Sequence, residues 1–299
     1  MNEEQVACLT LDLENDWYFD DPEYDHLTFE YIDEYIEMVK SLDVPVTFFV
    51  VGRTIERYPD VIDKLDRELD CEFHLHSYQH DTTKSYDFRT EVRAGKEAFE
   101  AHFGYEPTGY RAPQGNIDPE EFAILEEEGF VFDSSIFPSF RPGVYSNFDK
   151  PLAPYIAEGT DALVEVPIAV TPGTRIPVCQ SYLKLLGRSY LTYLKYAPLP
   201  DPLAFNTHLQ DFFRTDSHDR LEQPKRAIMT RNMDDSLELF SKAIEQIRAR
   251  GYEFRTMTEL VQAHTSESTE LLYDSAEVTS PESTTRVSAE DRSRVESED

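Results

Sequence analysis

Short apolar runs alternate with longer amphipathic stretches along most of this chain, and this alternation restricts the possible folds more than any other feature. The apolar runs are rich in β-branched and aromatic residues, as strands are; they cover residues 6–13, 45–52, 71–76, 129–133, 163–170 and 203–209. The intervening stretches show helical spacing in residues 27–42, 90–103, 119–128 and 234–250. Because strands that alternate with helices pair in parallel, the sequence predicts an α/β fold with a parallel sheet.

The number of these units favours a closed sheet. About six or seven strand–helix units fit before residue 264, and a barrel of about 250 residues is an ordinary single domain. We therefore expect one barrel domain over residues 1–264. Residues 265–299 are rich in Asp, Glu, Ser and Thr, a composition that buries too little apolar surface to offset the entropy of ordering. We predict a disordered acidic tail there.

The charge balance excludes some partners. The chain has 59 Asp and Glu against 28 Lys and Arg, a formal net charge of -31. Such a chain repels phosphate backbones and anionic membranes, which argues against nucleic acid as a partner. The acids run through the whole chain, as in proteins that stay hydrated while salt screens their repulsion. We therefore expect a protein from a salt-adapted organism; the charge itself says nothing about catalysis.

Three widely spaced cysteines, Cys8, Cys71 and Cys179, form no CxxC pair, as expected of free thiols in a reducing compartment. No apolar run reaches the roughly 18 residues of a membrane span. The acidic start of the chain also lacks the basic and apolar regions of a signal peptide. We expect a cytoplasmic protein without stable membrane insertion. The sequence does not indicate an oligomeric state.

Two histidines follow the predicted strand 71–76. His76 and His80 are four residues apart, so they would meet on one side of a helical turn and could bind one divalent ion. This spacing alone fits surface or core histidines equally well. Its position at the carboxyl end of a strand favours a metal site, because barrel active sites collect at those ends.

Three acidic residues alternate at the end of the first strand. Asp12, Glu14 and Asp16 would share one face of the chain. Carboxylates that leave an apolar strand need partners, and a metal is a suitable one. Two histidines and one carboxylate leave open positions on a hydrolytic metal, and a second carboxylate could take a proton from water. The alternative is an ordinary charged loop in an acidic chain.

Polar residues also follow three later strands. Arg111 follows a short strand and precedes a Pro/Gly turn, where it could hold a carboxylate by two parallel hydrogen bonds. Asp133 begins a segment that again follows a strand. His208 lies in the last predicted strand and could protonate a leaving amine, although a lone histidine in a strand is more often part of a core.

The order of these five segments resembles the polysaccharide deacetylase family, also called the NodB-homology or carbohydrate esterase family 4 deacetylases. The residues His76–His80 match the pattern HSxxH, and Arg111–Gly115 match RxPxG. The resemblance covers about residues 6–260. It implies a distorted (β/α) barrel, usually of seven strands, and hydrolysis of N-acetyl groups with one divalent metal ion, often zinc.

The resemblance also implies roles for individual residues. Asp12 corresponds to the general base of the family, and Arg111 to the arginine that orients this base. His76 and His80 correspond to two metal ligands. His208 corresponds to the general acid that protonates the amine. The metal would hold the oxyanion, with the backbone N–H of Tyr78 or of a neighbouring residue as a candidate donor.

Two departures from the family pattern leave assignments open. Many members carry adjacent acids in the first motif, whereas one residue separates Asp12 from Glu14 here. We therefore expect Glu14 to be the third metal ligand, with Asp16 as the alternative. The Asp-Trp pair that often ends the fourth motif is missing after Asp133, so the role of Asp133 stays open.

The predicted function is metal-dependent removal of N-acetyl groups from an N-acetylated sugar or glycan precursor. One alternative is hydrolysis of a small cyclic or linear non-sugar amide, with residues 180–199 as a cap over the groove. Those residues also fit an ordinary barrel helix, which we favour. Another alternative is an inactive carbohydrate-binding protein, which would have no need for Asp12, Arg111 and His208.

Overall fold

The computed structural model describes residues 5–19, 24 and 26–265. The strands and helices named below belong to one compact unit, residues 1–262. The acidic tail predicted for residues 265–299 lies outside the described residues apart from Thr265. Within the described part of the chain, no helix combines the length and the apolar character of a membrane span.

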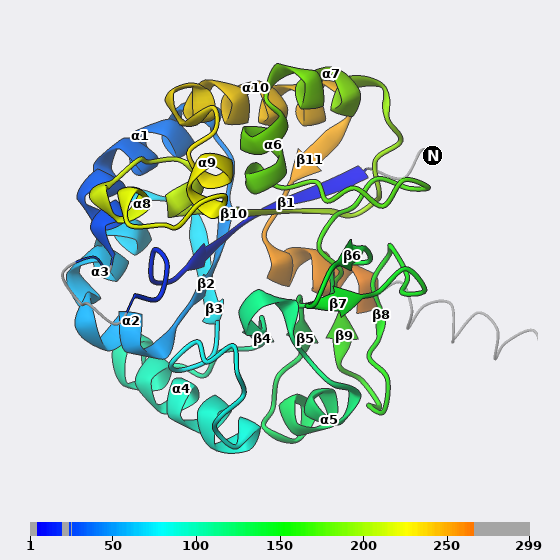
Figure 1. Cartoon of the computed structure of the whole chain (residues 1–299). Coiled ribbons are helices and arrows are strands. Elements are labelled where there is room, and N and C mark those ends of the chain that lie inside the picture. Colours follow the sequence, from blue (N-terminus) through cyan, green and yellow to red (C-terminus); the bar gives the residue numbers. More distant parts are fainter. Residues whose placement is uncertain (1–4, 20–23, 25, 266–299) are drawn as a thin grey trace, which may run out of the picture. The chain divides into compact units, whose positions relative to one another are not determined.

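A curled sheet forms the centre of this unit (Figure 1). Its parallel strands are paired in the order β10 (Leu203–His208), β1 (Gln5–Leu13), β2 (Val46–Val50), β3 (Cys71–Leu75), β4 (Gly109–Tyr110), β5 (Phe132–Asp133) and β9 (Val164–Glu165). Beyond β9 the chain returns to β10, where the Ala169 N–H donates to the Ala204 carbonyl at 2.9 Å. The predicted distorted (β/α) barrel is confirmed.

Three further pairings complete the strands. β8 (Tyr155–Ile156) pairs antiparallel with β9, and β11 (Tyr252–Phe254) pairs parallel with the first residues of β1. A separate hairpin consists of β6 (Phe140–Arg141) and β7 (Tyr145–Ser146).

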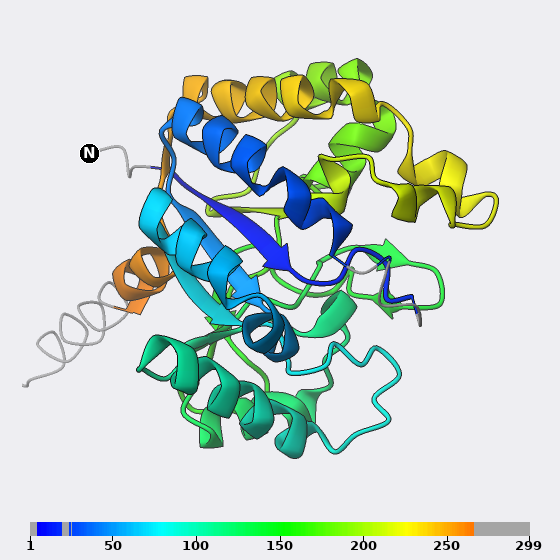
Figure 2. The same cartoon turned by 90° about the vertical axis from the view of Figure 1, so that its left-hand side faces the viewer.

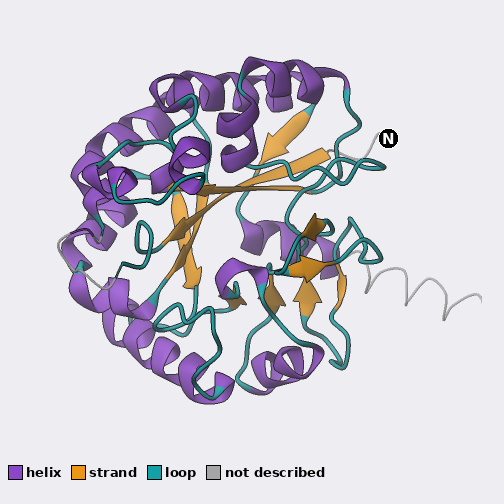
Figure 3. Cartoon of the chain, in the orientation of Figure 1, coloured by secondary structure: helices purple, strands orange, loops and turns teal. Residues whose placement is uncertain are grey.

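Helices cover the outer face of the sheet (Figure 3). They are α1 (Ile32–Leu42), α2 (Gly52–Arg57), α3 (Pro59–Glu68), α4 (Phe88–Phe103), α5 (Pro119–Glu127), α6 (Gln180–Leu186), α7 (Arg188–Tyr196) and α10 (Ser236–Ala249). The sequence patterns missed α2 and α3. In α3 only Ile62 and Leu65 are buried, so its apolar stripe is too narrow to stand out from the charged residues around it.

Alternation along β1 separates the outer core from the barrel interior. Leu9 and Leu11 pack with the surrounding helices in the largest apolar cluster, whereas Cys8 packs inside the barrel with Phe49 and Met257. Further along the strand, the inward positions of this face carry Thr10 and Asp12. Along β1 this face is therefore apolar at Cys8 and polar from Thr10 to Asp12.

Several loops gather at the carboxyl end of β1 (Figure 2). They include the segment after β1, the β6–β7 hairpin, and the region of α8 (Asp216–Asp219) and α9 (Lys225–Met229). Barrel enzymes build their sites from such loops, because the side chains that follow each strand converge there.

Candidate active site

The segment that carries the two histidines is a loop, not the helical turn expected from their spacing. Ser77 and His80 have positive φ angles of 65° and 57°, a region that side chains other than glycine rarely adopt. The buried Glu91 of α4 fixes this shape by accepting hydrogen bonds from Ser77 Oγ (2.7 Å) and from the backbone N–H groups of Tyr78 (3.1 Å) and Gln79 (2.5 Å). The Tyr78 N–H is therefore engaged, and its expected role as an oxyanion donor is wrong.

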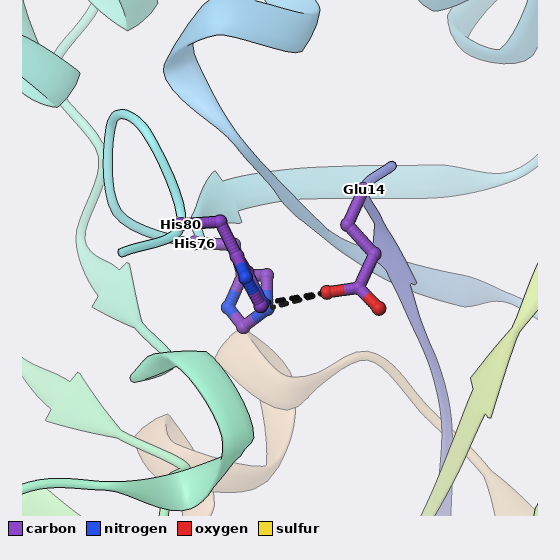
Figure 4. Close-up of side chains that lie close together, drawn as sticks. All are labelled: Glu14, His76 and His80. Atoms are coloured by element: carbon purple, nitrogen blue, oxygen red, sulfur yellow. Dashed lines mark ion pairs between the residues drawn. The ribbon is translucent and has the colours of Figure 1, made fainter. Parts of the chain in front are cut away.

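Glu14, His76 and His80 form a compact cluster of possible metal ligands. One ligand atom from each residue lies within 4.8 Å of the others. Glu14 Oε2 is 2.7 Å from His80 Nε2 and 3.4 Å from His76 Nε2. Figure 4 shows the carboxylate reaching from the end of β1 toward the two imidazoles, which both come from the loop after β3. All three side chains are largely shielded from solvent.

The hydrogen bonds of this cluster fit a divalent cation. His76 Nδ1 lies 2.8 Å from the Arg111 carbonyl, which can only accept, so the proton is on Nδ1 and the lone pair is on Nε2. His80 Nε2 lies close to Glu14 but makes no hydrogen bond of acceptable geometry, and neither does His80 Nδ1 within the described residues. Buried polar atoms rarely lack partners, and a shared cation would satisfy His80 Nε2 and Glu14 together.

Neighbouring residues hold the Glu14 carboxylate in place. Tyr18 Oη donates to Oε2 at 2.8 Å, and Gln210 Nε2 donates to Oε1 at 3.1 Å. The Tyr18 ring also stacks on His80 at 4.1 Å. Burial would raise the pKa of Glu14, but His80 and then His76 hold it well below its usual value. The carboxylate is thus ionised and oriented, as a metal ligand must be.

Asp16, the alternative ligand, has different partners. Its carboxylate accepts hydrogen bonds from Thr28 Oγ1 at 2.6 Å, from the Thr28 N–H at 3.3 Å and from Ser217 Oγ at 3.3 Å. Burial raises the pKa of Asp16. These contacts tie the segment after β1 to two other segments, and Asp16 is not part of the cluster with the histidines.

Arg111 is almost fully buried beside Asp12. Arg111 Nη1 donates to Asp12 Oδ1 at 2.6 Å and to Thr10 Oγ1 at 3.0 Å. The expected pair of parallel hydrogen bonds to one carboxylate is therefore wrong. The other donors are used by Ser134, whose carbonyl accepts from Nε at 2.8 Å and whose Oγ accepts from Nη2 at 2.9 Å. The guanidinium also lies 3.9 Å above the Phe49 ring, so its position is fixed on several sides.

The second oxygen of Asp12 faces β10. Asp12 Oδ2 accepts a hydrogen bond from Asn206 Nδ2 at 3.0 Å and lies 3.3 Å from His208 Nε2. Burial alone would raise the pKa of Asp12, but Arg111 foremost, and then His76 and His208, hold it well below its usual value. Asp12 is therefore a carboxylate at neutral pH, beside the candidate metal ligands.

His208 is held by acidic residues on two sides. Its Nδ1 atom lies 3.4 Å from Asp211 Oδ2, and Asp211 in turn accepts from the buried Lys184 at 2.8 Å and from Ser181 Oγ at 2.5 Å. Burial would lower the pKa of His208, but its bonds to Asp12 and Asp211 raise it well above the usual value.

Sequence reasoning did not find Asp211 or Lys184. The position of Asp211, three residues after a candidate general acid, was a signal that could have found it. Nothing in the amphipathic pattern of α6 distinguishes Lys184 from a surface lysine.

Asp133 lies behind the site and does not line the cavity described next. Asp133 and Glu165 are both fully buried. The Asp133 carboxylate accepts hydrogen bonds from the Ser135 N–H (2.9 Å) and from Ser135 Oγ (2.8 Å). Ser135 Oγ in turn accepts a hydrogen bond from the Ala112 N–H at 2.7 Å. Burial and the Asp133 charge raise the pKa of Glu165 well above its usual value, and burial raises the pKa of Asp133. The charge of Arg111 opposes this rise in the pKa of Asp133. Burial, together with the Asp133 charge, raises the pKa of Tyr110 and of Tyr155.

A cavity of about 390 Å³ joins these residues, enough for a small ligand. Its floor includes the candidate ligands, Asp12 and His208, and its walls include the aromatic residues Trp17, Tyr145 and Tyr182. The segment 180–199 forms two helices, α6 and α7. Residues of α6 line one side of the cavity.

A family comparison agrees with this geometry. The family model named polysaccharide deacetylase matches residues 17–132, which include His76, His80 and Arg111. Over these residues the chain is similar to the polysaccharide deacetylase family. The resemblance seen in the sequence motifs is thereby confirmed.

Curated relatives align with this chain over part of their length. The peptidoglycan deacetylase-like protein FGM2 of Gibberella zeae is 30% identical over 94 residues, 30% of this chain and 28% of the relative. A peptidoglycan-N-acetylglucosamine deacetylase of Bacillus cereus is 23% identical over 105 residues, 34% of this chain and 38% of the relative. The chain thus spans well under half the length of these two relatives.

Solved structures share the fold of this chain. A candidate polysaccharide deacetylase from Mycobacterium smegmatis has 19% identity and a TM-score of 0.58, covering 96% of each chain. A wild-type family 4 carbohydrate esterase pseudoenzyme from Bacillus anthracis has 14% identity and a TM-score of 0.52, covering 87% of this chain and 66% of that one. The fold therefore occurs in a protein described as a pseudoenzyme, so activity has to be argued from the site.

Proposed function

We propose that this protein is a metal-dependent hydrolase that removes N-acetyl groups from an N-acetylated sugar or glycan precursor. One observation carries the proposal: three candidate metal ligands, an ionised Asp12 and a cationic His208 line the floor of one cavity. Carbohydrate binding alone needs no such set, which argues against the inactive alternative. Similarity to the family supports the same reaction class.

In this proposal Glu14, His76 and His80 hold one divalent ion. Two imidazoles and a carboxylate, without a thiolate, are a usual ligand set for catalytic zinc. When bound, the ion would acidify a water molecule and polarise the acetyl carbonyl. His76 is prepared for this role by its bond to the Arg111 carbonyl, and Glu14 by its bonds to Tyr18 and Gln210.

Asp12 acts as the general base and accepts the proton of the attacking water. Arg111 and Asn206 orient its two oxygens and keep it ionised. The same contacts make Asp12 a weak base, because each stabilises the carboxylate over the acid. Asp12 can therefore deprotonate only a water whose own pKa is strongly lowered, and this requirement links the base to the neighbouring ligand cluster.

His208 acts as the general acid. As the water oxygen bonds to the acetyl carbon and the C–N bond breaks, His208 gives its proton to the departing nitrogen, so the products are acetate and a free amine. Its side chain is 23% exposed, in the cavity, where the nitrogen of a bound substrate would lie. Asp211 holds the opposite ring nitrogen and favours the protonated form.

The proposal also includes a setting in a salt-rich, reducing cytoplasm. Its support is the formal net charge of -31 and the free state of all three cysteines. The acetate-release assays are therefore run in buffers of high ionic strength.

An acetate-release screen tests the proposal. The zinc-loaded protein is incubated with free, nucleotide-linked, lipid-linked and polymeric N-acetyl sugars, and with small cyclic and linear amides as the competing substrate class. Release of acetate from at least one sugar, abolished by a chelator and restored by zinc, is expected. Hydrolysis of the small amides alone would favour the other substrate class, and no hydrolysis would favour the inactive alternative.

A further inference from the structure

Two cations line the mouth of the cavity without a partner of opposite charge. Arg141 is the last residue of β6, Lys225 is the first residue of α9, and both side chains line the same cavity as the candidate metal ligands. Both residues are exposed. Among residues 5–19, 24 and 26–265, neither of their side chains forms an ion pair or a hydrogen bond, although carboxylates outnumber basic residues twofold in this chain. Two cations that lack an ion pair thus line one cavity.

The two charges also act on each other. Burial, and then the positive charge of Arg141, lower the pKa of Lys225. The Lys225 ammonium lies 5.2 Å from the centre of the Trp17 ring, an attraction that does not neutralise its charge. Two like charges in the lining of one cavity favour the binding of an anion, because an anion relieves the repulsion.

The carboxylates of the cavity are not available as counter-ions. Each accepts bonds from another partner: Asp12 from Arg111, Glu14 from Tyr18 and Gln210, Asp16 from Thr28, and Asp211 from Lys184. The positive charge at the mouth is therefore separate from the balanced charges at the floor.

We infer that the substrate carries an anionic oxygen group, a phosphate or a carboxylate, which Arg141 and Lys225 bind while the N-acetyl group lies at the Glu14–His76–His80 cluster. This inference rests on the proposed deacetylase function. Arginine presents paired N–H groups that match phosphate or carboxylate oxygens, and lysine adds a mobile point charge. Tyr145, four residues after Arg141, lines the cavity and offers an aromatic face to a sugar ring.

Binding measurements test the inference without relying on turnover. Calorimetry compares N-acetylglucosamine 1-phosphate with N-acetylglucosamine on the zinc-loaded protein, at the lowest salt concentration that preserves its circular dichroism spectrum. The double variant Arg141→Gln/Lys225→Gln should bind the phosphate at least about tenfold more weakly, as expected for lost bonds to a charged group. The control Arg188→Gln/Lys195→Gln removes the same charge from exposed positions outside the cavity and should bind as the wild type does.

Two binding results would overturn the inference. Unchanged phosphate affinity in the double variant would place the anion at the metal or elsewhere. An equal loss of phosphate affinity in the control variant would show that the effect comes from the overall charge of the protein.

Turnover measurements then identify the source of the anion. Acetate release is compared for nucleotide-linked, polyprenyl-diphosphate-linked and carboxylate-bearing N-acetyl sugars against neutral N-acetylglucosamine oligomers. The ratio of anionic to neutral kcat/KM should exceed one in the wild type and fall about tenfold in the double variant, mainly through KM. Preference for neutral oligomers would overturn the inference but keep the deacetylase proposal. Phosphate binding through the two cations without turnover of any sugar would instead contradict the proposed function.

Discussion

Replacement of Arg111 by lysine is expected to damage both stability and turnover, because the charge is kept while the hydrogen-bond geometry is lost. The guanidinium serves Asp12, Thr10 and both acceptors of Ser134 through three different nitrogen atoms. A single ammonium nitrogen cannot reach all of these positions. If it stays with Asp12, the carbonyl and the hydroxyl of Ser134 lose their donor inside the barrel.

The size of the effect follows from these contacts. A buried polar group without a partner costs about 1–3 kcal/mol, so two orphaned acceptors lower the free energy of unfolding of Arg111→Lys by about 2–6 kcal/mol. Turnover falls by about a hundredfold, since a displacement of about 1 Å of a reacting group costs this much.

Urea unfolding and acetate release measure the two effects on the same preparation. Arg93→Lys is the matched control, because Arg93 forms an exposed ion pair with Glu128 whose loss changes stability by less than about 1 kcal/mol. Wild-type stability and turnover in Arg111→Lys would refute the view that the arginine fork positions the base.

Three further variants test other parts of the site. Burial raises the pKa of Glu165 in the folded protein, so the wild type loses stability as the pH rises above the pKa of this residue in the unfolded chain, about 4.3. Glu165→Gln should therefore gain stability over the wild type by up to about 1.4 kcal/mol per pH unit from pH 5 to 7 in urea unfolding. A pH-independent difference would contradict the raised pKa of Glu165. Asp211→Asn should keep bound zinc but lose about 10- to 100-fold in kcat, and full activity would remove Asp211 as a support of His208. His76→Ala should lose both zinc and activity while its circular dichroism spectrum stays native; stoichiometric zinc in that variant would remove His76 as a ligand.

The fold could be predicted because its pattern is carried by local sequence. The apolar runs at β1, β2, β3 and β10 are buried on the faces of one sheet, and burial requires their alternation with amphipathic helices. The predicted boundaries of the strands were less accurate where a strand pairs with its neighbour over only a few residues. The run 163–170 forms regular pairing only at Val164–Glu165, because the chain then leaves β9 to bridge to β10.

The members of the candidate site were easier to name than their contacts. The resemblance to the family predicted Glu14, His76 and His80 as metal ligands, and the structure does bring these side chains together. The sequence could not predict the left-handed conformation of Ser77, because this conformation depends on a hydrogen bond to Glu91, fourteen residues later. Local patterns do not report such long-range hydrogen bonds.

The same limit applies to the partners of Asp12 and His208. Ser134 and Asn206 reach the site from strands that are distant in sequence, and both look like ordinary polar residues at strand ends. Their roles depend on the closure of the sheet, which places β10 beside β1.

The most direct test of the central claim is acetate release by Asp12→Asn measured together with its bound zinc. The account predicts wild-type zinc content, because Asp12 is not in the ligand cluster, and a loss of about 100- to 10,000-fold in turnover, the usual contribution of a general base. A zinc-loaded Asp12→Asn protein that releases acetate at the wild-type rate would contradict the account.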